Sequence, residues 1–521
     1  MAIPEINDLF DAFYDRLELN ISVPRFNNKR EVKFSYPLIR GYVFSNIHWS
    51  DQYNMLVYDV VEPEINENLK NLYSLVSLGL QELISVEYKG NQKNEQVRDF
   101  LDYNVKVILS QLGQKLSKQD YLKLMYYVFR DFLGLNEIEP LMRDPFIEDI
   151  ECNGANNPIF ITHRFFENMR TNLIFDHQRL TEFVEKLAQR CGRYISYAKP
   201  VLDGALPDGS RVNATYTSDV TSKGPSFTIR KFTKDPWTPT RLIEFNAATA
   251  EMYAYLWLAV ENKLNIMVIG ETSSGKTTFL NTITFFIKPE ARIVTIEDTR
   301  ELNLPHENWL PSVQREGFTT GGHGVTYGEV TLFDLLKASL RQNPDYVIVG
   351  EVRGQEAYVL FQGMASGHPS MGTFHAGSVE MLLRRLESNP INLSPSLIQS
   401  LDLVVFAYKV TQGERNVRRI KNIFEIVKVL DEIGKAEYNI AFEWDPKTDS
   451  YSSLKSDFLL KRIEKMTSYS LNELKLELKR RTAVLNLLVK MKVFDYLSFS
   501  KYIARYYADP EGVLKELRIM E

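Results

Sequence analysis

One eight-residue segment constrains the fold of this chain more than any other. Residues 270–277 read GETSSGKT; they follow the apolar run NIMVI and open a helix-forming run, TTFLNTITFFI. A strand, a glycine-rich turn and a helix in this order build a phosphate-binding loop. The glycines let backbone N–H groups surround phosphate oxygens, and the helix N-terminus adds positive potential. A chance glycine-rich turn seldom carries the whole pattern, so the chain is predicted to bind ATP and to hydrolyse it.

The motif also predicts individual contacts. Lys276 is expected to reach the β- and γ-phosphates, and the Thr277 hydroxyl is expected to ligate Mg²⁺. The predicted cofactors are therefore ATP and Mg²⁺. The predicted nucleotide-binding residues are Gly270, Glu271, Thr272, Ser273, Ser274, Gly275, Lys276, Thr277 and Thr278.

Two other apolar runs end in carboxylates. Residues 345–351 read DYVIVGE, and the run RIVTIEDT ends at residue 299. In open sheets of parallel strands, the carboxyl ends face the crevice where ligands bind. Glu351 is predicted to lie near the metal, and one of the neighbours Glu297 and Asp298 to polarise the attacking water. Taken alone, each run fits a surface acid equally well, but a phosphate loop in the same sheet favours the functional interpretation.

Two histidines and two arginines are further candidates. His368 and His375 lie in ASGHPSMGTFHA. Lone histidines are more often structural, and a metal site is disfavoured because no cysteine or third histidine lies nearby at ligand spacing. An imidazole could instead sense the γ-phosphate by hydrogen bonding. Arg211 and Arg230 lie in short strands far upstream, which suits arginine fingers that act on a neighbouring subunit's nucleotide. An ordinary surface or structural role is the commoner one for such arginines.

The residue pattern predicts several domains, because 521 residues exceed what one hydrophobic core supports. Apolar strands alternate with helices from residue 242 onward, which predicts a parallel sheet buried on both faces. Short strands around one helix, at 178–191, predict an α+β unit between about 135 and 232. The elements expected before it are an amphipathic helix within residues 1–20 (Ile6, Leu9, Phe10, Phe13 and Leu17 on one face), two strands between 37 and 61, and helices at 64–86, 93–112 and 118–133.

Domain boundaries follow from these elements. Pro236 and Pro239 predict a stiff linker. The glycine-rich segment 317–331 is predicted to form a mobile loop. The tail from about residue 456 is predicted to be helical. The predicted domains are a variable, partner-contacting region (1–115), an α+β domain (116–235), a linker (236–245) and an ATPase domain with a helical tail (246–521).

Composition restricts the compartment and the partners. The net charge is −5, which disfavours a general DNA-coating role. The two cysteines, Cys152 and Cys191, are too few for a disulfide framework or a four-cysteine zinc site. No run approaches 18 consecutive apolar residues, and the N-terminus lacks a signal core. A cytoplasmic protein is expected.

The motifs occur together, and in the same order, in one known family. GETSSGKTT, TIEDT, LRQNPDYVIVGEVR and ASGHPSMGTFHA, preceded by EPLMRDPFIEDIECNG, ALPDGSRVN and FTIRKF, resemble the type II/type IV secretion ATPase superfamily. The resemblance covers about residues 135 to 410 and is closest to the archaeal branch, which includes type IV pilus assembly ATPases and the archaellum motor ATPase. It implies an α/β fold: a C-terminal RecA-like P-loop ATPase domain with a mostly parallel sheet, preceded by a smaller α+β (PAS-like) domain and a mixed N-terminal region.

The resemblance also implies residue roles. Glu297 of the Asp box would be the general base, and Glu351 of the Walker B segment the metal-site carboxylate. The His box falls on His368 and His375, and the trans-acting arginines on Arg211 and Arg230. The implied catalytic residues are Glu297, Glu351, Lys276, Arg211, Arg230, His368 and His375, and the implied Mg²⁺ ligands are Thr277, Glu351 and Asp298. Thr299 departs from the proline usual after the Asp box, and the four-cysteine zinc insertion of many bacterial members is absent.

The expected function is a hexameric cytoplasmic ATPase that powers assembly of a type IV pilus-like filament, or secretion. It would act on a polytopic inner-membrane platform protein, indirectly on pilin subunits, and associate peripherally with the inner face of the membrane through these partners. Three alternatives stay open: an archaellum motor, a nucleic-acid translocating motor, and a nucleotide-gated scaffold with little turnover. The acidic net charge and the lack of a basic, aromatic-studded loop speak against nucleic acid. The intact set of catalytic residues speaks against the scaffold.

A basic run in the tail has two interpretations. Lys479, Arg480 and Arg481, near Lys490 and Lys492, lie on a predicted helix. A solvated helix face is the commoner reading. The sharper hypothesis is a docking surface for acidic loops or anionic lipid.

Overall fold

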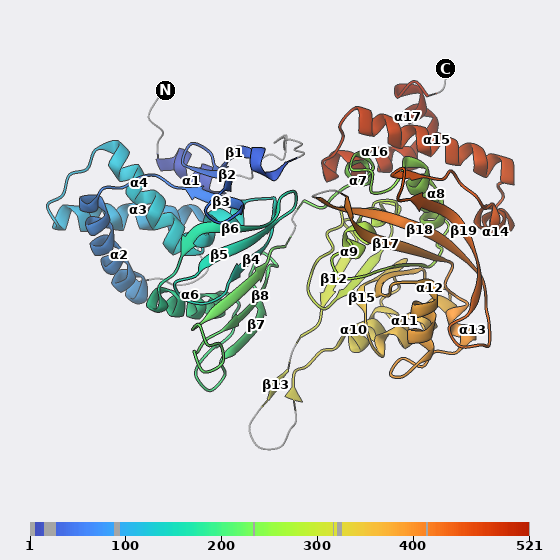
Figure 1. The fold of residues 1–521 in the computed structure, drawn as a ribbon, viewed down its shortest axis with the longest axis horizontal. Coiled ribbons are helices and arrows are strands. Elements are labelled where there is room, and N and C mark those ends of the chain that lie inside the picture. The colour runs from blue at the N-terminus through green and yellow to red at the C-terminus, as the bar shows by residue number, and fades with distance from the viewer. Residues whose placement is uncertain are drawn as a thin grey trace. The chain divides into compact units, whose positions relative to one another are not determined.

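The computed structural model describes residues 6–14, 28–87, 94–232, 235–315, 317–319, 326–412 and 415–519. The chain forms two compact units, Met1–Phe232 and Thr233–Glu521 (Figure 1). The N-terminal unit has one hydrophobic core, and the C-terminal unit has a core on each side of its sheet.

Nine strands form one sheet in the N-terminal unit, in the order β1-β2-β3-β6-β5-β4-β9-β8-β7. β3 pairs in parallel with β6, and Val57 lies beside Arg170. The first three strands therefore continue the sheet of the following six, and the boundary predicted at residue 115 does not divide two units. The strands are β1 (Lys33–Ile39), β2 (Val43–Ser50), β3 (Met55–Val61), β4 (Ile147–Cys152), β5 (Pro158–His163), β6 (Glu167–Ile174), β7 (Val201–Ala205), β8 (Arg211–Thr215) and β9 (Ser226–Arg230).

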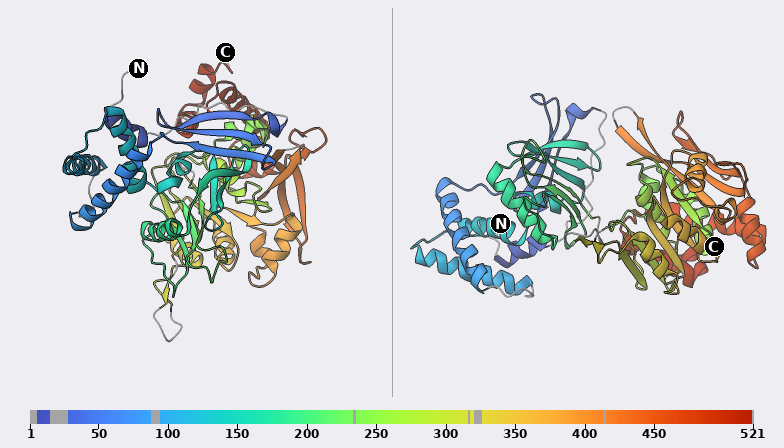
Figure 2. Two further views of the ribbon diagram at one scale, coloured as in Figure 1. Left: turned by 60° about the vertical axis from the view of Figure 1, so that its left-hand side comes forward. Right: turned by 90° about the horizontal axis from the view of Figure 1, so that it is seen from below.

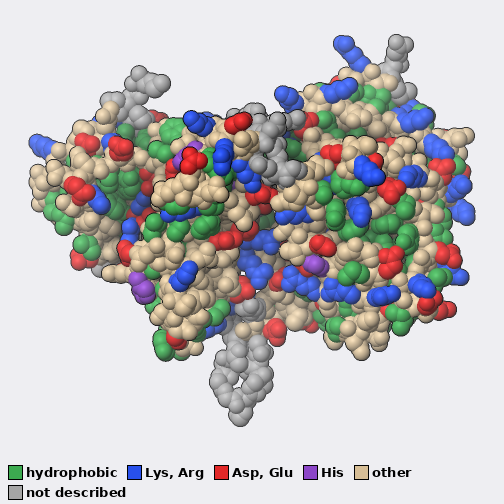
Figure 3. All heavy atoms as spheres, viewed as in Figure 1, with side chains coloured by type: hydrophobic (Ala, Val, Ile, Leu, Met, Phe, Trp, Pro, Cys, Tyr) green, Lys and Arg blue, Asp and Glu red, His purple; other side chains and the backbone are tan. Residues whose placement is uncertain are grey.

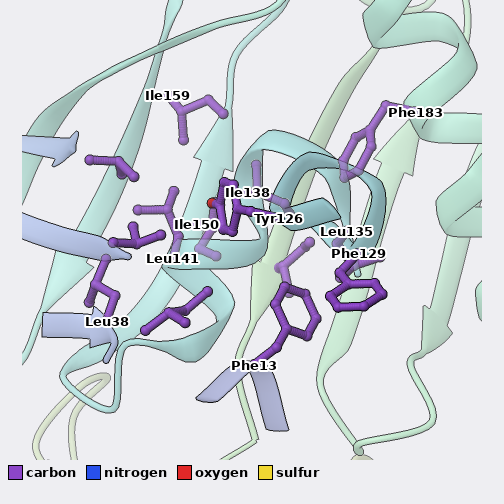
Figure 4. Packing of buried hydrophobic residues seen from close by; sticks show 14 of the residues in the cluster. Phe13, Leu38, Tyr126, Phe129, Leu135, Ile138, Leu141, Ile150, Ile159 and Phe183 are labelled. Atoms are coloured by element: carbon purple, nitrogen blue, oxygen red, sulfur yellow. The ribbon is translucent and has the colours of Figure 1, made fainter. Parts of the chain in front are cut away.

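The helices of this unit lie close to the predicted ranges, and Figure 2 shows α2 to α4 grouped to one side of the sheet. In α1, Leu9, Phe10 and Phe13 are buried, as their spacing predicts, whereas Leu17 lies outside the described residues. Figure 4 shows Phe13 and Phe129 packed near Leu135 in the same core as Leu38 and Ile150. The helices are α1 (Ile6–Tyr14), α2 (Glu67–Glu87), α3 (Asn94–Gln111), α4 (Lys118–Val128), α5 (Glu139–Arg143) and α6 (His177–Arg190).

The sheet of the C-terminal unit has the order β12-β11-β15-β16-β10-β17-β18-β19-β20. Six neighbouring strands pair in parallel, in the order β12, β11, β15, β16, β10 and β17, which confirms the predicted α/β class. The remaining strands, β18, β19 and β20, continue the sheet from β17 in antiparallel pairs. The carboxyl ends of six strands therefore meet at one edge. The strands are β10 (Ile266–Gly270), β11 (Ile293–Glu297), β12 (Trp309–Val313), β15 (Tyr346–Val352), β16 (Ser370–His375), β17 (Leu403–Gln412), β18 (Arg415–Val429), β19 (Ala436–Asp445) and β20 (Ser450–Tyr451).

Two predicted connections differ in detail. The expected linker contains a helix, α7, because proline at a first helical position needs no N–H partner; Thr238 caps it. The predicted loop 317–331 contains the short pair β13 (Phe318–Thr319) and β14 (Thr326–Tyr327), and residues 320–325 between them lie outside the described residues. The helices are α7 (Pro239–Glu244), α8 (Ala250–Glu261), α9 (Lys276–Thr284), α10 (Leu332–Ser339), α11 (Glu356–Ala365), α12 (Val379–Glu387), α13 (Pro395–Ile398), α14 (Phe458–Met466), α15 (Leu471–Lys490), α16 (Tyr496–Ala508) and α17 (Pro510–Glu516).

The helical tail predicted from residue 456 packs against α8 (Figure 1). Arg481 of α15 is buried there. Its guanidinium donates to Glu261 at 2.6 Å and to Glu477 at 2.9 Å, and it lies 4.6 Å from the ring centroid of Trp257. The hypothesis of a basic docking run is therefore wrong for Arg481, which joins α15 to α8.

Replacing Arg481 by alanine should destabilise the C-terminal unit by about 2 to 3 kcal/mol, because two glutamates would lose their cation. We place the value below that of a fully buried pair because the Glu261 and Glu477 side chains are 25% and 23% exposed. The midpoint of urea unfolding measures the change. Lys479→Ala, an exposed neighbour on α15, is the matched control and should shift the midpoint little. Equal midpoints for the two variants would contradict the assigned role of Arg481.

Candidate nucleotide site

The phosphate loop joins the end of β10 to the start of α9, as the sequence predicts. Gly270 closes the strand: a Cβ there would lie 2.3 Å from the Ala407 carbonyl oxygen and 2.5 Å from Ser274 Oγ. Gly275 precedes α9 with φ of 87°, a left-handed conformation that glycine adopts readily. The intervening Glu271, Thr272, Ser273 and Ser274 form the loop, and Thr277 and Thr278 lie in the first turn of α9. The free N–H groups of that turn can receive phosphate oxygens.

Lys276 rests on the loop itself. Its Nζ donates to the carbonyl oxygen of Glu271 at 2.8 Å. Burial lowers the pKa of Lys276, and the charge of Arg353 lowers it further, while Glu351 and Glu301 act in the opposite direction. The charges of two carboxylates therefore act on the ammonium, which holds a carbonyl contact that a phosphate can replace.

Glu351 projects from a bulge in β15. Val349 pairs with Gly372 and Val352 with Phe374, so Gly350 and Glu351 together oppose only Thr373. Such a bulge re-aims a side chain at the end of a strand. Thr373 Oγ1 fixes the bulge by donating to the Gly350 carbonyl oxygen at 2.6 Å. Burial raises the pKa of Glu351, but the hydrogen bond and charge of Arg353 and the charges of Lys276 and His375 outweigh it, so the pKa is lowered.

Glu297 ends β11 and is 2% exposed. Its Oε1 accepts N–H groups of Glu301 and Leu302, both at 2.9 Å, whereas its buried Oε2 has no hydrogen-bond partner among the described residues. Burial raises the pKa of this carboxyl to about 7. Gly350 makes room for it, since a Cβ on Gly350 would lie 2.9 Å from Glu297 Cγ. A buried acceptor with a pKa near neutrality suits a general base.

Asp298 lies beside Glu351. Arg353 contacts both, at 3.7 Å from Asp298 Oδ2 and 2.6 Å from Glu351 Oε2, and Gln314 donates to Asp298. Within the described residues, no group of three His, Cys, Asp or Glu side chains could hold a metal. Mg²⁺ needs fewer, because it usually takes one or two carboxylates along with phosphate oxygens and water. The carboxylates of Asp298 and Glu351, which Arg353 joins, match that number, and Thr277, the third predicted ligand, lies in the first turn of α9.

The structure separates the two candidate histidines. His375 ends β16 beside Gly270, and its Nε2 lies 2.8 Å from Thr272 Oγ1 in the phosphate loop. His368 precedes the other end of the same strand, so the whole length of β16 lies between them. His368 therefore does not join the group around Lys276, and only His375 stays in the candidate site.

Arg211 and Arg230 lie directly opposite each other on β8 and β9. Directly opposed residues of an antiparallel pair leave the sheet on the same face. Arg211 donates to Asp203 Oδ2 at 3.0 Å. The two guanidinium groups thus share one face of the N-terminal unit, separate in the chain from the phosphate loop.

Two residues of the site were not predicted as site residues. The charges of Glu301 and Arg353 act on the pKa of Lys276, and Arg353 bridges Glu351 and Asp298. Their sequence positions carried the signal: Glu301 is a third carboxylate four residues after Glu297, and Arg353 follows Glu351 by two. Charged residues this close in sequence to paired carboxylates are candidates for balancing the net charge of the site.

Comparison with family models gives two matches. Residues 133–432 match the model described as "Type II/IV secretion system protein", and residues 447–521 match a "PilB3-like, C-terminal" model. An uncharacterized protein of Methanocaldococcus jannaschii is 39% identical over 398 residues, which is 75% of this chain and 71% of that protein. The type IV secretion system protein PtlH of Bordetella pertussis is 31% identical over 287 residues, covering 48% of this chain and 82% of PtlH.

Solved structures of similar proteins include the ATPase DotB of Legionella pneumophila, at 19% identity and a TM-score of 0.39, covering 75% of this chain and 96% of DotB. The pilus retraction motor PilT with bound ADP is 17% identical with a TM-score of 0.37, covering 68% of this chain and 93% of PilT. In the part of the chain that the structure describes, no helix has the length and apolar character needed to cross a bilayer.

Proposed function

The chain belongs to the type II/IV secretion system protein family and is an ATP-hydrolysing enzyme of that family, and from this premise we propose that it is the hexameric motor of a type IV pilus-like filament. In this proposal the motor acts at the cytoplasmic face of the membrane on a platform protein that inserts pilin subunits. The PilB3-like match over residues 447–521 and the similarity to archaeal proteins support the archaeal pilus branch.

One observation carries the enzymatic part. The carboxyl edge of the parallel sheet brings together the phosphate loop with Lys276, the bulged Glu351, the buried Glu297 and the loop-bound His375. These groups come from β10, β11, β15 and β16, which are neighbours in the sheet. Phosphoryl transfer needs positioning and charge stabilisation more than covalent chemistry, and this edge supplies both.

The proposed reaction assigns a task to each side chain. Lys276 exchanges the Glu271 carbonyl for β- and γ-phosphate oxygens. Glu297 Oε2 accepts a proton from the water whose oxygen attacks the γ-phosphorus, and the bond to the β-phosphate oxygen breaks to leave ADP. Thr277, Asp298 and Glu351 would hold Mg²⁺, which would offset the negative charge of the phosphates. His375 senses the conformation of the phosphate loop through its hydrogen bond with Thr272.

The proposed motor shares each site between subunits. Arg211 and Arg230 of one subunit would contact the nucleotide held by Lys276 of the next, which closes the interface. Hydrolysis and phosphate release remove that differential contact, and the interface reopens. The linker at Pro236–Pro239 would be the hinge of this motion.

ATPase rate against protein concentration, with mass from light scattering, tests the motor. We expect the rate per subunit to rise as the protein assembles toward a hexamer. A monomer that hydrolyses ATP equally fast would overturn the shared site and leave the ATPase assignment in place.

In the source organism, deletion of the gene should remove surface filaments seen by electron microscopy. Loss of swimming with filaments intact would favour the archaellum alternative.

A further inference from the structure

We propose that Arg418 is a positioning residue for the phosphate loop, an inference that rests on the proposed ATPase function. Its Nε donates to the carbonyl oxygen of Ser273 at 3.1 Å. Ser273 has φ of 59°, a left-handed conformation that residues other than glycine adopt only at a cost. A charged donor on its carbonyl stabilises that conformation. Arg418 therefore holds the tip of the loop in the form that receives phosphate.

The sheet explains how a residue so far along the chain reaches the loop. β17 runs parallel to β10 with Ala407 beside Gly270. Lys409, two residues further along β17, lies opposite Arg418 of β18. Arg418 thus lies beyond the carboxyl end of β10, where the phosphate loop begins, and its side chain reaches across β17.

Gly275 gives a second contact between Arg418 and the loop. A Cβ on Gly275 would lie 3.1 Å from Arg418 Cδ and 3.9 Å from its Nε. The aliphatic stem of the arginine therefore lies against the residue that precedes α9. The same side chain touches the loop at its strained peptide and at the start of its helix.

The loop is held from both sides of β10. Thr272 is bonded by His375 from β16, and Ser273 by Arg418 from β18. β16 and β17 flank β10 on opposite sides, and β18 follows β17. Two adjacent loop residues are thus fixed from outside the loop, which lowers the cost of ordering it when a nucleotide binds.

The first test combines binding with local dynamics. Arg418→Ala should weaken binding of Mg-ADP, measured by calorimetry, roughly tenfold, as expected for loss of a charged hydrogen bond. Amide hydrogen exchange over residues 270–278 should become faster in the nucleotide-free protein, while the thermal unfolding midpoint stays the same. Lys428→Ala is the matched control: it removes one positive charge from an exposed position on the same strand, ten residues away, and should change neither measurement.

The second test separates anchoring from charge. Glycine at position 273 adopts a left-handed φ without strain, so Ser273→Gly should restore a large part of the affinity that Arg418→Ala loses. Wild-type affinity and exchange in Arg418→Ala would overturn the inference, and so would a double variant that binds no better than Arg418→Ala. If the wild-type protein bound no Mg-ADP, the proposed function would fail, and the exchange measurement made without nucleotide would still decide whether Arg418 anchors the loop.

Discussion

Glu297→Gln should lower the rate of ATP hydrolysis roughly 10²- to 10⁴-fold while ATP still binds, as expected when a general base is removed. Glutamine keeps the Oε1 that accepts the two N–H groups of Glu301 and Leu302. It replaces the buried Oε2 that would take the proton of the attacking water. The loop after β11 should therefore stay in place while the chemical step is lost. Single-turnover hydrolysis and a separate binding measurement check this.

The pH dependence of the hydrolysis rate is a second test of Glu297 as the general base. Burial raises the pKa of Glu297 to about 7, so the wild-type rate should fall as pH decreases through that value, because a protonated carboxyl cannot accept a proton. The stability has the opposite dependence. A carboxyl whose pKa is higher in the folded state than in the unfolded chain costs stability as pH rises from about 4.5 to about 7.

The Glu297→Gln variant does not lose stability in this way, because its side chain does not ionise. Relative to Glu297→Gln, the wild-type protein should lose on the order of 2 to 3 kcal/mol of unfolding free energy between pH 4.5 and pH 8. Glu307→Gln, an exposed carboxylate in the segment before β12, is the control and should keep the wild-type rate. Hydrolysis by Glu297→Gln at the wild-type rate would show that another group takes the proton.

Replacing both Arg211 and Arg230 by alanine should lower hydrolysis by about 10³- to 10⁵-fold, the range of an arginine finger. Both side chains leave the same face of the sheet, from directly opposed positions on β8 and β9, so they can approach one phosphate together. ATP binding should change far less, because the phosphate loop lies in the other unit. A loss of hydrolysis rate much larger than the loss of ATP affinity distinguishes an arginine finger from a residue that only binds the nucleotide.

A control for this variant comes from the same unit. Arg40 is exposed in the turn between β1 and β2, and Arg40→Ala should leave both rate and binding unchanged. If the double variant hydrolyses ATP as fast as Arg40→Ala, neither arginine acts as a finger.

Local sequence patterns predicted the parts of the fold that local chemistry decides. The strand, glycine turn and helix around Lys276 lie where the motif places them, because the loop conformation depends on Gly270 and Gly275 themselves. The apolar strands β10, β11, β15 and β16 pair in parallel, as their continuous hydrophobic runs predict, whereas β18, β19 and β20 add antiparallel pairs to the same sheet. The amphipathic spacing of α1 likewise predicted Leu9 and Phe13 as core residues.

Long-range pairing decided what the sequence patterns missed. The parallel contact of β3 with β6 joins segments more than a hundred residues apart, so the boundary predicted at 115 vanishes. The two histidines of one motif separate because a strand lies between them. Arg481 was assigned to a basic surface run, but it is bound by Glu261 of α8. No local pattern marked Arg418, which reaches Ser273 of the phosphate loop from β18.

A mixing experiment tests whether each site is completed by the neighbouring subunit. Lys276→Ala lacks the phosphate-binding ammonium, and Arg211→Ala/Arg230→Ala lacks the arginines; each protein alone should be nearly inactive. In an equimolar mixture, some interfaces pair an intact phosphate loop with intact arginines, so we expect a hydrolysis rate well above the sum of the rates of the two separate proteins. If the mixture is no more active than its components, although light scattering shows that they assemble together, the site is not shared between subunits.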